Sequence, residues 1–356
     1  MKKVLYLTNI EVPYRVRFFN ELAKHCDLTV VYERKKSKTR NAAWASGEQC
    51  AHRAVFLNGV NLSSESAFSF GILRYIFDKK YDAIVVGCYN SPIQMMAILL
   101  MRLFGIPYCL STDGEIFLNG SGIKNKIKRF VLSGAQAYLA AGERCADSLA
   151  AVAGDKPVYP YYFSSLDRSE IMANRSSISD RPRNGTVLVV GQYLDVKGLD
   201  VALNAAQMDP DREYLFVGMG KRTALFTEKY HPERVENVRI IPFLQKKDLE
   251  AEYRRCALMV LPSRQECWGL VINEAASFGT PIVSTTGSGA AVEFLSDGYP
   301  QYLAVPGDEK DLHRAILQLI NTEDLQAYSM YLMNKSESYT IEKGVQVHLH
   351  AFGIEV

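Results

Sequence analysis

Short, uninterrupted runs of β-branched and other apolar residues recur along this chain, and each is followed by a stretch long enough to form a helix. Such runs are typical of strands buried on both faces of a parallel sheet, because a strand with one solvated face alternates apolar and polar residues. The runs are residues 4–8, 28–32, 83–87, 108–111, 137–141, 187–191, 214–218, 238–241, 257–261 and 281–285. The sequence therefore predicts an α/β fold of parallel sheets covered by helices.

A polar segment divides these runs into two groups of five. Between residues 164 and 185, Arg, Ser, Asn and Pro replace the apolar pattern, as is typical of an interdomain linker. The chain has 356 residues, which is too long for one ordinary core. We therefore expect two Rossmann-like, doubly wound domains that face a cleft, at 1–165 and 185–335, with a linker at 166–184 and a terminal segment at 336–356.

Composition excludes several classes of protein. Hydrophobic residues make up 48% and charged residues 22%, the balance of a globular protein rather than a disordered one. The seven cysteines never form a C-x-x-C pair, which argues against a disulfide framework or zinc ribbon and for a reducing compartment. The first apolar run is broken by Asn9 and Glu11, so it predicts a strand rather than a signal peptide. The most apolar stretch, 95–110, is interrupted by Arg102 and Pro107 and is no membrane span. We expect a cytoplasmic protein.

Charge is distributed unevenly along the chain. Residues 1–165 hold 21 basic and 13 acidic residues, whereas the remainder holds 20 and 26. A basic first half favours a negatively charged surface near it. Two basic tracts, 34–40 and 123–131, carry much of this charge.

The second tract has an apolar helical face, made of Ile123, Ile127 and Phe130 with Val131. Two interpretations remain open: a helix lying on an anionic membrane, peripheral to its inner face, or an ordinary helix whose apolar stripe is in the core. Nucleic acid is disfavoured as a partner, since the tracts lack interleaved aromatic residues.

The segment 261–289 carries the clearest chemical signal. A strand ends at residue 261, and a loop leads into a helix that we expect to stop at Gly279. The first N–H groups of that helix, near Gly269, Leu270 and Val271, are suited to a diphosphate.

Two carboxylates flank this anion site. Glu266 precedes it, and Glu274 lies about one turn inside the helix. Carboxylates would repel phosphates, so we expect both to accept hydrogen bonds from hydroxyl groups, one from a ribose and the other from a hexose.

This pattern resembles the E-x7-E signature of retaining glycosyltransferases of family 4, which have the GT-B fold. The matching residues are Pro262-Ser263, Glu266, Trp268-Gly269-Leu270, Glu274-Ala275-Ala276 and Gly279-Thr280-Pro281. The resemblance implies that Glu266 contacts the donor hexose and Glu274 the ribose, while the amides of 269–271 hold phosphate. It also implies that the last helix crosses back to the first domain.

The resemblance extends upstream of this segment. Gln192 and Lys197 stand where the family has two basic residues that neutralise the diphosphate, although Gln192 replaces an Arg and is neutral. Gly218 and Gly220 resemble the glycine-rich loop beside the donor. Phe243 stands where that family places contacts to the nucleobase.

The implied reaction is hexosyl transfer with retention from a UDP- or GDP-sugar, with no cofactor and no metal ion. Lys197, Gln192 and the helix N-terminus would stabilise the leaving diphosphate, which can then take the proton of the acceptor. The D-x-D sequence at Asp209 and Asp211 falls in a turn before a strand, so we do not assign it to a metal.

Acceptor-side candidates are fewer. Asp113 follows the fourth strand of the first half, where it either contacts the acceptor or caps a helix. Tyr14 and Arg15 follow the first strand and, like Asp113, are candidates for contact with the acceptor. Similar enzymes build surface polysaccharide, lipopolysaccharide or glycolipid, which implies a saccharide or lipid-linked saccharide acceptor.

Two alternatives remain open from sequence. One is a nucleotide-sugar epimerase of the same fold, which would need a base that we do not identify. The other is a non-catalytic nucleotide-sugar-binding protein, for which Gln192 is the one hint. A dinucleotide oxidoreductase is disfavoured, because neither first strand is followed by G-x-G-x-x-G.

Overall fold

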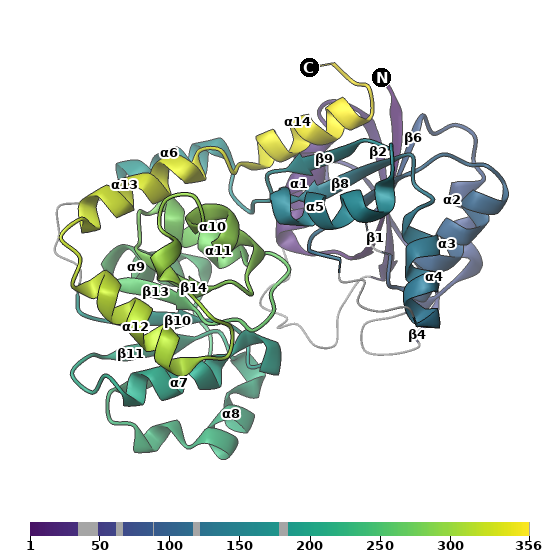
Figure 1. Cartoon of the computed structure of the whole chain (residues 1–356). Helices are drawn as coiled ribbons and strands as arrows, with labels where there is room; N and C mark the ends of the chain where they lie inside the picture. The colour runs from purple at the N-terminus through teal and green to yellow at the C-terminus, as the bar shows by residue number, and fades with distance from the viewer. Residues whose placement is uncertain (35–48, 62–66, 88, 117–121, 178–183, 356) are drawn as a thin grey trace. The chain divides into compact units, whose positions relative to one another are not determined.

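The computed structural model describes the whole chain except residues 35–48, 62–66, 88, 117–121, 178–183 and 356. The chain divides into two compact units, Met1–Ser165 with Ile341–Val356 and Leu166–Thr340. Each unit has its own parallel sheet with helices packed on it, as predicted (Figure 1).

The first unit is built on a seven-stranded parallel sheet in the order β3-β2-β1-β6-β7-β8-β9. Its strands are β1 (Lys3–Ile10), β2 (Asp27–Arg34), β3 (Arg53–Phe56), β6 (Ala83–Val86), β7 (Cys109–Thr112), β8 (Ala137–Ala141) and β9 (Val158–Tyr161). The five strands predicted from sequence are confirmed. The two that were not predicted, β3 and β9, are the edge strands, and their partly exposed residues do not form a continuous apolar run.

Helices and one small hairpin complete this unit. They are α1 (Pro13–Leu22), α2 (Leu73–Ile76), α3 (Pro92–Leu103), α4 (Ile123–Leu132), α5 (Gly142–Ala153) and α14 (Ile341–Ala351), with the hairpin of β4 (Val60–Asn61) and β5 (Ala67–Phe68). The last helix, α14, packs on α1, β8 and β9, so the end of the chain belongs to the first unit.

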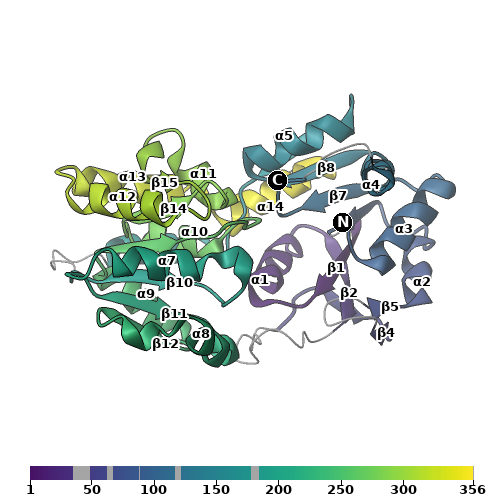
Figure 2. The ribbon, with the colours of Figure 1, turned by 60° about the horizontal axis from the view of Figure 1, so that its bottom comes forward.

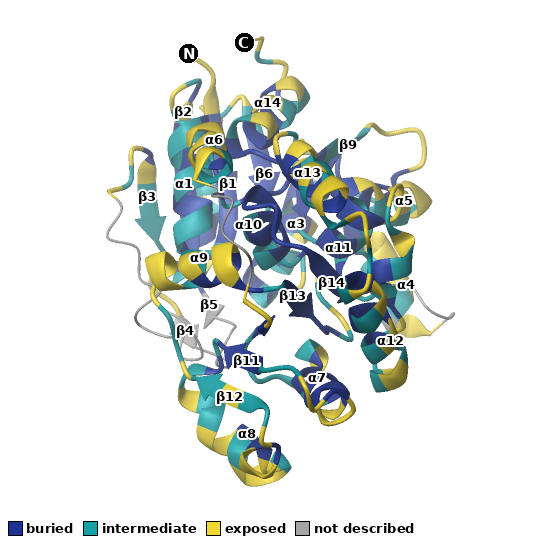
Figure 3. Ribbon diagram, turned by 90° about the vertical axis from the view of Figure 1, so that its left-hand side faces the viewer, coloured by how far each residue is buried: buried dark blue, intermediate teal, exposed yellow. Residues whose placement is uncertain are grey.

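The second unit is built on a six-stranded parallel sheet in the order β12-β11-β10-β13-β14-β15. Its strands are β10 (Val187–Val190), β11 (Tyr214–Val217), β12 (Val238–Ile241), β13 (Leu258–Leu261), β14 (Ile282–Thr285) and β15 (Leu303–Ala304). Every residue of β10, β11, β13 and β14 is buried, which explains their continuous apolar sequences. Figure 3 shows β11, β13 and β14 in the colour of buried residues.

The helices of the second unit include one inside the segment that we interpreted as a linker. They are α6 (Arg168–Ser176), α7 (Leu199–Gln207), α8 (Thr223–Tyr230), α9 (Lys246–Arg255), α10 (Leu270–Ser277), α11 (Gly289–Leu295), α12 (Glu309–Ile320) and α13 (Leu325–Ser336). Helix α6 begins with a capping box of Asp167 and Glu170, but Ile171 is its one fully buried residue. It therefore lacks the apolar stripe by which a helix is recognised in sequence.

Strand order fixes where ligands can bind in each unit. In the second sheet, β10 is flanked by β11 on one side and by β13 on the other, and in the first sheet β1 is flanked by β2 and β6. Figure 2 shows β11 beside β10 and β2 beside β1. In doubly wound sheets the chain leaves the two neighbouring strands at such a switch point, here β10 and β13 or β1 and β6, toward opposite faces of the sheet, and ligands bind there beyond the carboxyl ends of the strands. Within the described residues, no helix is both long and apolar enough to cross a membrane.

Candidate functional site

Two loops meet at the switch point of the second sheet, one after β10 and one after β13. The carbonyl of Val196, in the short helical turn Asp195–Lys197, accepts hydrogen bonds from the backbone N–H groups of Arg264 (2.8 Å) and Gln265 (3.1 Å). Gly198 has φ +63°, and a Cβ atom there would lie 2.1 Å from the carbonyl oxygen of Pro262. Only glycine allows this approach, which fixes the first loop against the second.

Arg264 strengthens this junction with its side chain. Its guanidinium forms a two-pronged ion pair with Asp200 (2.7 and 2.7 Å) and donates a hydrogen bond to the carbonyl of Asp195 (3.0 Å). Burial opposes ionisation of Asp200, but the guanidinium lowers the pKa of this carboxyl below its usual value. Arg264 was not predicted from sequence, although its place two residues before Glu266 was a usable signal.

The junction brings Lys197 and Glu266 into contact. Their side chains form an ion pair, although the residues are 69 positions apart, and they are only 23% and 16% exposed. Sequence reasoning assigned the two residues to adjacent parts of one ligand, and the structure places them together. A cation suited to phosphate thus lies beside a carboxylate suited to a hydroxyl group.

The loop after β13 enters α10 through a fixed turn. Gly269 has φ +102°, and a Cβ atom there would lie 2.9 Å from Leu261 Cδ2 and 3.0 Å from Ser288 Oγ. The buried Trp268 donates from Nε1 to Asn273 (2.9 Å), and its carbonyl accepts from Ser288 Oγ (2.9 Å). The N-terminus of α10 at Leu270 and Val271 is therefore held rigidly, with the partial positive charge that favours an anion.

Glu274 lies on α10 and is oriented by a tyrosine from α9. Tyr253 is fully buried and donates its hydroxyl to Glu274 Oε2 (3.2 Å). Burial, followed by the nearby Glu274 carboxylate, raises the pKa of Tyr253 well above its usual value, so it remains a neutral donor. No local sequence pattern marks Tyr253, because its contact depends on the packing of α9 on α10.

The remaining predicted donor residues follow β10, β11 and β12. Gln192 is half-buried in the loop after β10, and Gly218 follows β11 with φ +104°. The N–H of Gly220 donates to the carbonyl of Pro242 (2.7 Å), which joins this loop to the one that carries the half-buried Phe243. All these residues lie at the carboxyl-end edge of one sheet, and their individual roles remain predictions.

A cation that was not predicted approaches the same loops. Arg222 ends the short turn Gly220–Arg222 and donates to the carbonyl of Tyr193 (3.1 Å). Tyr193 directly follows Gln192 in the chain. The Arg222 guanidinium therefore lies near position 192, where the family that the sequence resembles has an Arg.

In the first unit, the structure brings Arg15 and Asp113 together. They form an ion pair, and the hydroxyl of Tyr161 donates to Asp113 Oδ1 (3.0 Å). Burial opposes the charge of Arg15, but Asp113 raises the pKa of the guanidinium well above its usual value. Tyr14 packs instead against the ring of Phe163 (5.7 Å between centroids). Asp113 is thus bound to a cation and a tyrosine.

The D-x-D sequence has a structural role at its first residue. Asp209 is buried and accepts hydrogen bonds from Tyr214 (2.9 Å) and Arg212 (2.6 Å). Among the residues that the structure describes, no group of three or more His, Cys, Asp or Glu side chains could hold a metal ion.

Comparison with known proteins agrees with this architecture. Residues 172–331 match the family model "Glycosyl transferases group 1". An uncharacterized glycosyltransferase from Methanocaldococcus jannaschii is 29% identical over 268 residues, which cover 72% of this chain and 71% of the relative.

Two solved structures are similar over nearly the whole chain. HepE from Anabaena in complex with UDP has a TM-score of 0.72 at 15% identity, over 99% of this chain and 100% of that one. WaaG, a glycosyltransferase involved in lipopolysaccharide biosynthesis, has a TM-score of 0.65 at 12% identity, over 99% of each chain. These similarities support a glycosyltransferase with the GT-B fold, whose residues 172–331 match the group 1 family.

Proposed function

We propose that this chain is a retaining glycosyltransferase that moves a hexose from a UDP- or GDP-sugar to a saccharide or lipid-linked saccharide. The observation that carries the proposal is the pairing of Lys197 with Glu266 beside the N-terminus of α10. A diphosphate needs the cation and the helix dipole, and a hexose needs the carboxylate. The complex of HepE with UDP supports a nucleotide ligand for this fold.

In this proposal the donor lies across the switch point of the second sheet. Its diphosphate takes the ammonium of Lys197 and the amides of Gly269, Leu270 and Val271, so Glu266 is released to a hexose hydroxyl. Glu274, held by Tyr253, accepts from the ribose. Phe243 borders the nucleobase.

The leaving group determines the chemistry. Negative charge grows on the diphosphate as its bond to the hexose breaks, and fixed dipoles together with the Lys197 ammonium group stabilise that charge without rearranging. The departing phosphate oxygen takes the proton of the acceptor hydroxyl on the same face of the sugar, which gives retention. Gln192 donates a neutral hydrogen bond, and Arg222 supplies the second positive charge. This route uses no metal ion and no cofactor.

The acceptor contacts the first unit through Asp113, Arg15 and Tyr14. Asp113 is partly exposed, with 26% of its side chain accessible, and forms an ion pair with Arg15. A carboxylate held in this way accepts hydrogen bonds from saccharide hydroxyls. The similarity to WaaG, which acts in lipopolysaccharide biosynthesis, supports a surface saccharide or glycolipid as the product.

The test is a turnover assay with a panel of UDP- and GDP-sugars, with and without saccharide acceptors and with excess EDTA. We expect transfer to an acceptor, an unchanged anomeric configuration in the product by NMR, and no loss of rate with EDTA. Conversion of the donor sugar without acceptor would indicate an epimerase, and nucleotide binding without any turnover would indicate a binding protein. Inversion at the anomeric carbon would contradict the proposed chemistry.

A further inference from the structure

Helix α4 exposes the apolar face that its sequence predicts. Ile123, Ile127 and Phe130 are 75%, 50% and 53% exposed, while Val131 and Leu132, at the end of the helix, are buried. Burial of this stripe in the core, one of the two interpretations left open by the sequence, is therefore wrong for these three residues. The helix is held by its C-terminal end and leaves the rest of its apolar stripe in solvent.

The exposed surface continues onto α3, which packs against α4. The two helices lie side by side in Figures 1 and 2. The guanidinium of Arg102 lies 3.9 Å from the centre of the Phe130 ring and donates to the Phe130 carbonyl, which joins the two helices. Leu99, Leu103 and Phe104, at the end of α3, are 43%, 75% and 62% exposed. We call these six exposed residues the α3–α4 face: Leu99, Leu103, Phe104, Ile123, Ile127 and Phe130.

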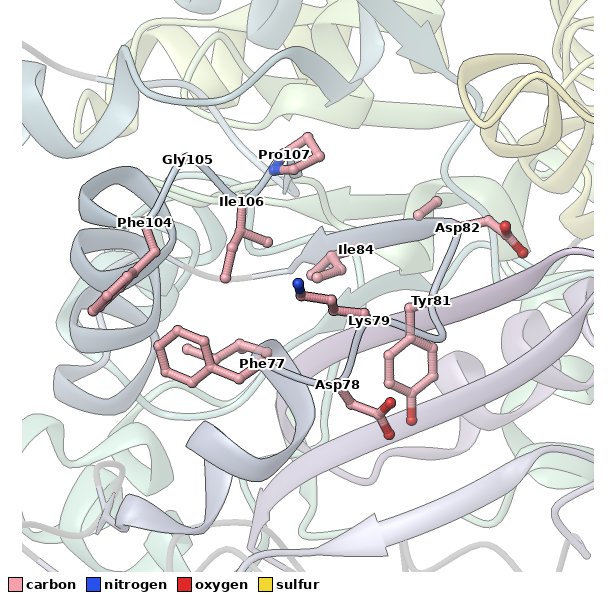
Figure 4. A pocket seen from close by; sticks show the side chains of 12 residues that line it. Phe77, Asp78, Lys79, Tyr81, Asp82, Ile84, Phe104, Gly105, Ile106 and Pro107 are labelled. Atoms are coloured by element: carbon pink, nitrogen blue, oxygen red, sulfur yellow. The ribbon is translucent and has the colours of Figure 1, made fainter.

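One edge of this face borders a hollow of about 480 Å³ (Figure 4). Phe104 is part of both, and its ring packs on Phe77, which is 41% exposed (5.1 Å between ring centroids). Lys79 lines the same hollow. The apolar surface therefore extends from α4 over the end of α3 to the end of α2. Isolated exposed apolar residues are common, but an extended group of them marks an interaction surface.

On α3 and α4 themselves, the charges beside the α3–α4 face have one sign, whereas the hollow at its edge also carries Asp78, which pairs with Lys80, and Asp82. Lys126 and Arg129 are exposed on α4 between its apolar residues, and Arg102 borders Phe130. The sequences of α3 and α4 contain no aspartate or glutamate. A partner that covers this face must therefore offer apolar groups together with negative charge.

We propose that the α3–α4 face docks the first unit onto an anionic lipid bilayer. Lys126 and Arg129 bind lipid phosphates, while Ile123, Ile127 and Phe130 enter the boundary between headgroups and acyl chains. A bilayer supplies both required features, a negative surface and an apolar layer beneath it. A second copy of this chain would bring the same cations against each other, so a symmetric dimer through this face is disfavoured.

The experiment is co-sedimentation of the full chain with vesicles of phosphatidylcholine alone or with 30% phosphatidylglycerol. We expect binding to the anionic vesicles, weakened by salt. Each cation near such a surface accounts for about a fivefold change in affinity, so Lys126→Gln with Arg129→Gln should weaken binding about 25-fold. Ile123→Ser with Ile127→Ser should weaken it about tenfold or more, because less apolar surface enters the bilayer.

Matched variants elsewhere in the chain serve as controls. Lys247→Gln with Lys310→Gln removes the same charge from exposed helical positions of the second unit, and Leu225→Ser removes an exposed apolar side chain that is 56% accessible. These variants should bind vesicles as the unmodified chain does. Equal losses in the control and test variants, or equal binding to neutral vesicles, would overturn the proposal. So would a dimer in solution that Ile127→Ser dissociates. Because lipid binding is measured without donor or acceptor, the outcome does not depend on the proposed glycosyl transfer.

Discussion

The ion pair of Lys197 with Glu266 predicts that one substitution will affect turnover and stability for different reasons. Lys197→Met keeps most of the aliphatic stem but removes the ammonium group. If that group stabilises the charge that develops on the diphosphate, its loss should lower kcat/KM by about 10²–10³-fold, or about 3–4 kcal/mol, the usual effect of removing one fixed donor from such a site. The two side chains are 23% and 16% exposed, so water can replace the lost contact only in part.

The same substitution leaves the Glu266 carboxylate without its cation in the absence of ligand. A hydrogen bond to a charged group contributes about 1.5–3 kcal/mol, so we expect the free energy of unfolding of the second unit to fall by that amount. Adding Glu266→Gln to Lys197→Met removes the uncompensated charge and should restore part of the lost stability. It should not restore turnover, because Glu266→Gln also removes the carboxylate proposed to hold the hexose. The double-mutant cycle thus separates the two effects.

Three measurements complete this test: UDP and GDP affinity by calorimetry, turnover of the donor, and urea unfolding. Lys310→Met is the matched control, since Lys310 is an exposed lysine on α12. The control should change none of the three quantities. If Lys197→Met kept nucleoside diphosphate affinity within twofold and turnover within threefold, the assignment of Lys197 to the diphosphate would be refuted, whatever the change in stability.

Two further predictions concern buried polar groups. Tyr253→Phe removes the hydroxyl that orients Glu274, so it should weaken UDP or GDP binding about tenfold, as measured by calorimetry. The control Tyr328→Phe removes another buried hydroxyl of the same unit and should leave the affinity unchanged. Equal affinities for both variants would contradict this prediction. Burial lowers the pKa of His348 and His52 to about 4, so between pH 6.5 and 4 the unfolded chain binds more protons than the folded one. The stability of the first unit should therefore be full above pH 6.5 and fall as the pH falls toward 4, by about 3 kcal/mol for each histidine. Urea unfolding at several pH values measures this, and His348→Gln should show a shallower decline; an unchanged slope would exclude His348 as a source.

The sheet edge explains why the candidate site can be rigid before any ligand binds. Hydrogen bonds from Val196 to the second loop, the close approach of Gly198 and the Arg264–Asp200 pair all join the loops after β10 and β13. Catalysis by fixed charges requires this kind of preorganisation, because the site then spends little energy on rearrangement when the charge develops.

The amino-acid sequence by itself determined the sheets and the segment around α10. Nine of the ten predicted strands consist mostly of buried residues, and a strand covered on both faces has an uninterrupted apolar sequence. The tenth, β12, was predicted from its apolar sequence although none of its residues is buried, and β3, β9 and β15, which have at most one buried residue each, were not predicted. The spacing of Glu266 and Glu274 around the start of a helix could also be predicted from sequence, because it involves only residues close together in the chain. Glycine also stands at 198 and 269, where the backbone has a positive φ that only glycine readily takes.

Only the tertiary structure decided which distant groups meet. The Lys197–Glu266 contact exists because β10 and β13 are neighbours in the sheet although two strands separate them in the chain. Arg15 meets Asp113 because they follow β1 and β7 at the same edge of the first sheet, across the intervening β6. Tyr253 reaches Glu274 through helix packing that no local pattern encodes. Helix periodicity showed that Ile123, Ile127 and Phe130 share one side of α4, but not whether that side faces the core or solvent. That choice depends on how the whole helix docks, and α4 is anchored through Val131 and Leu132.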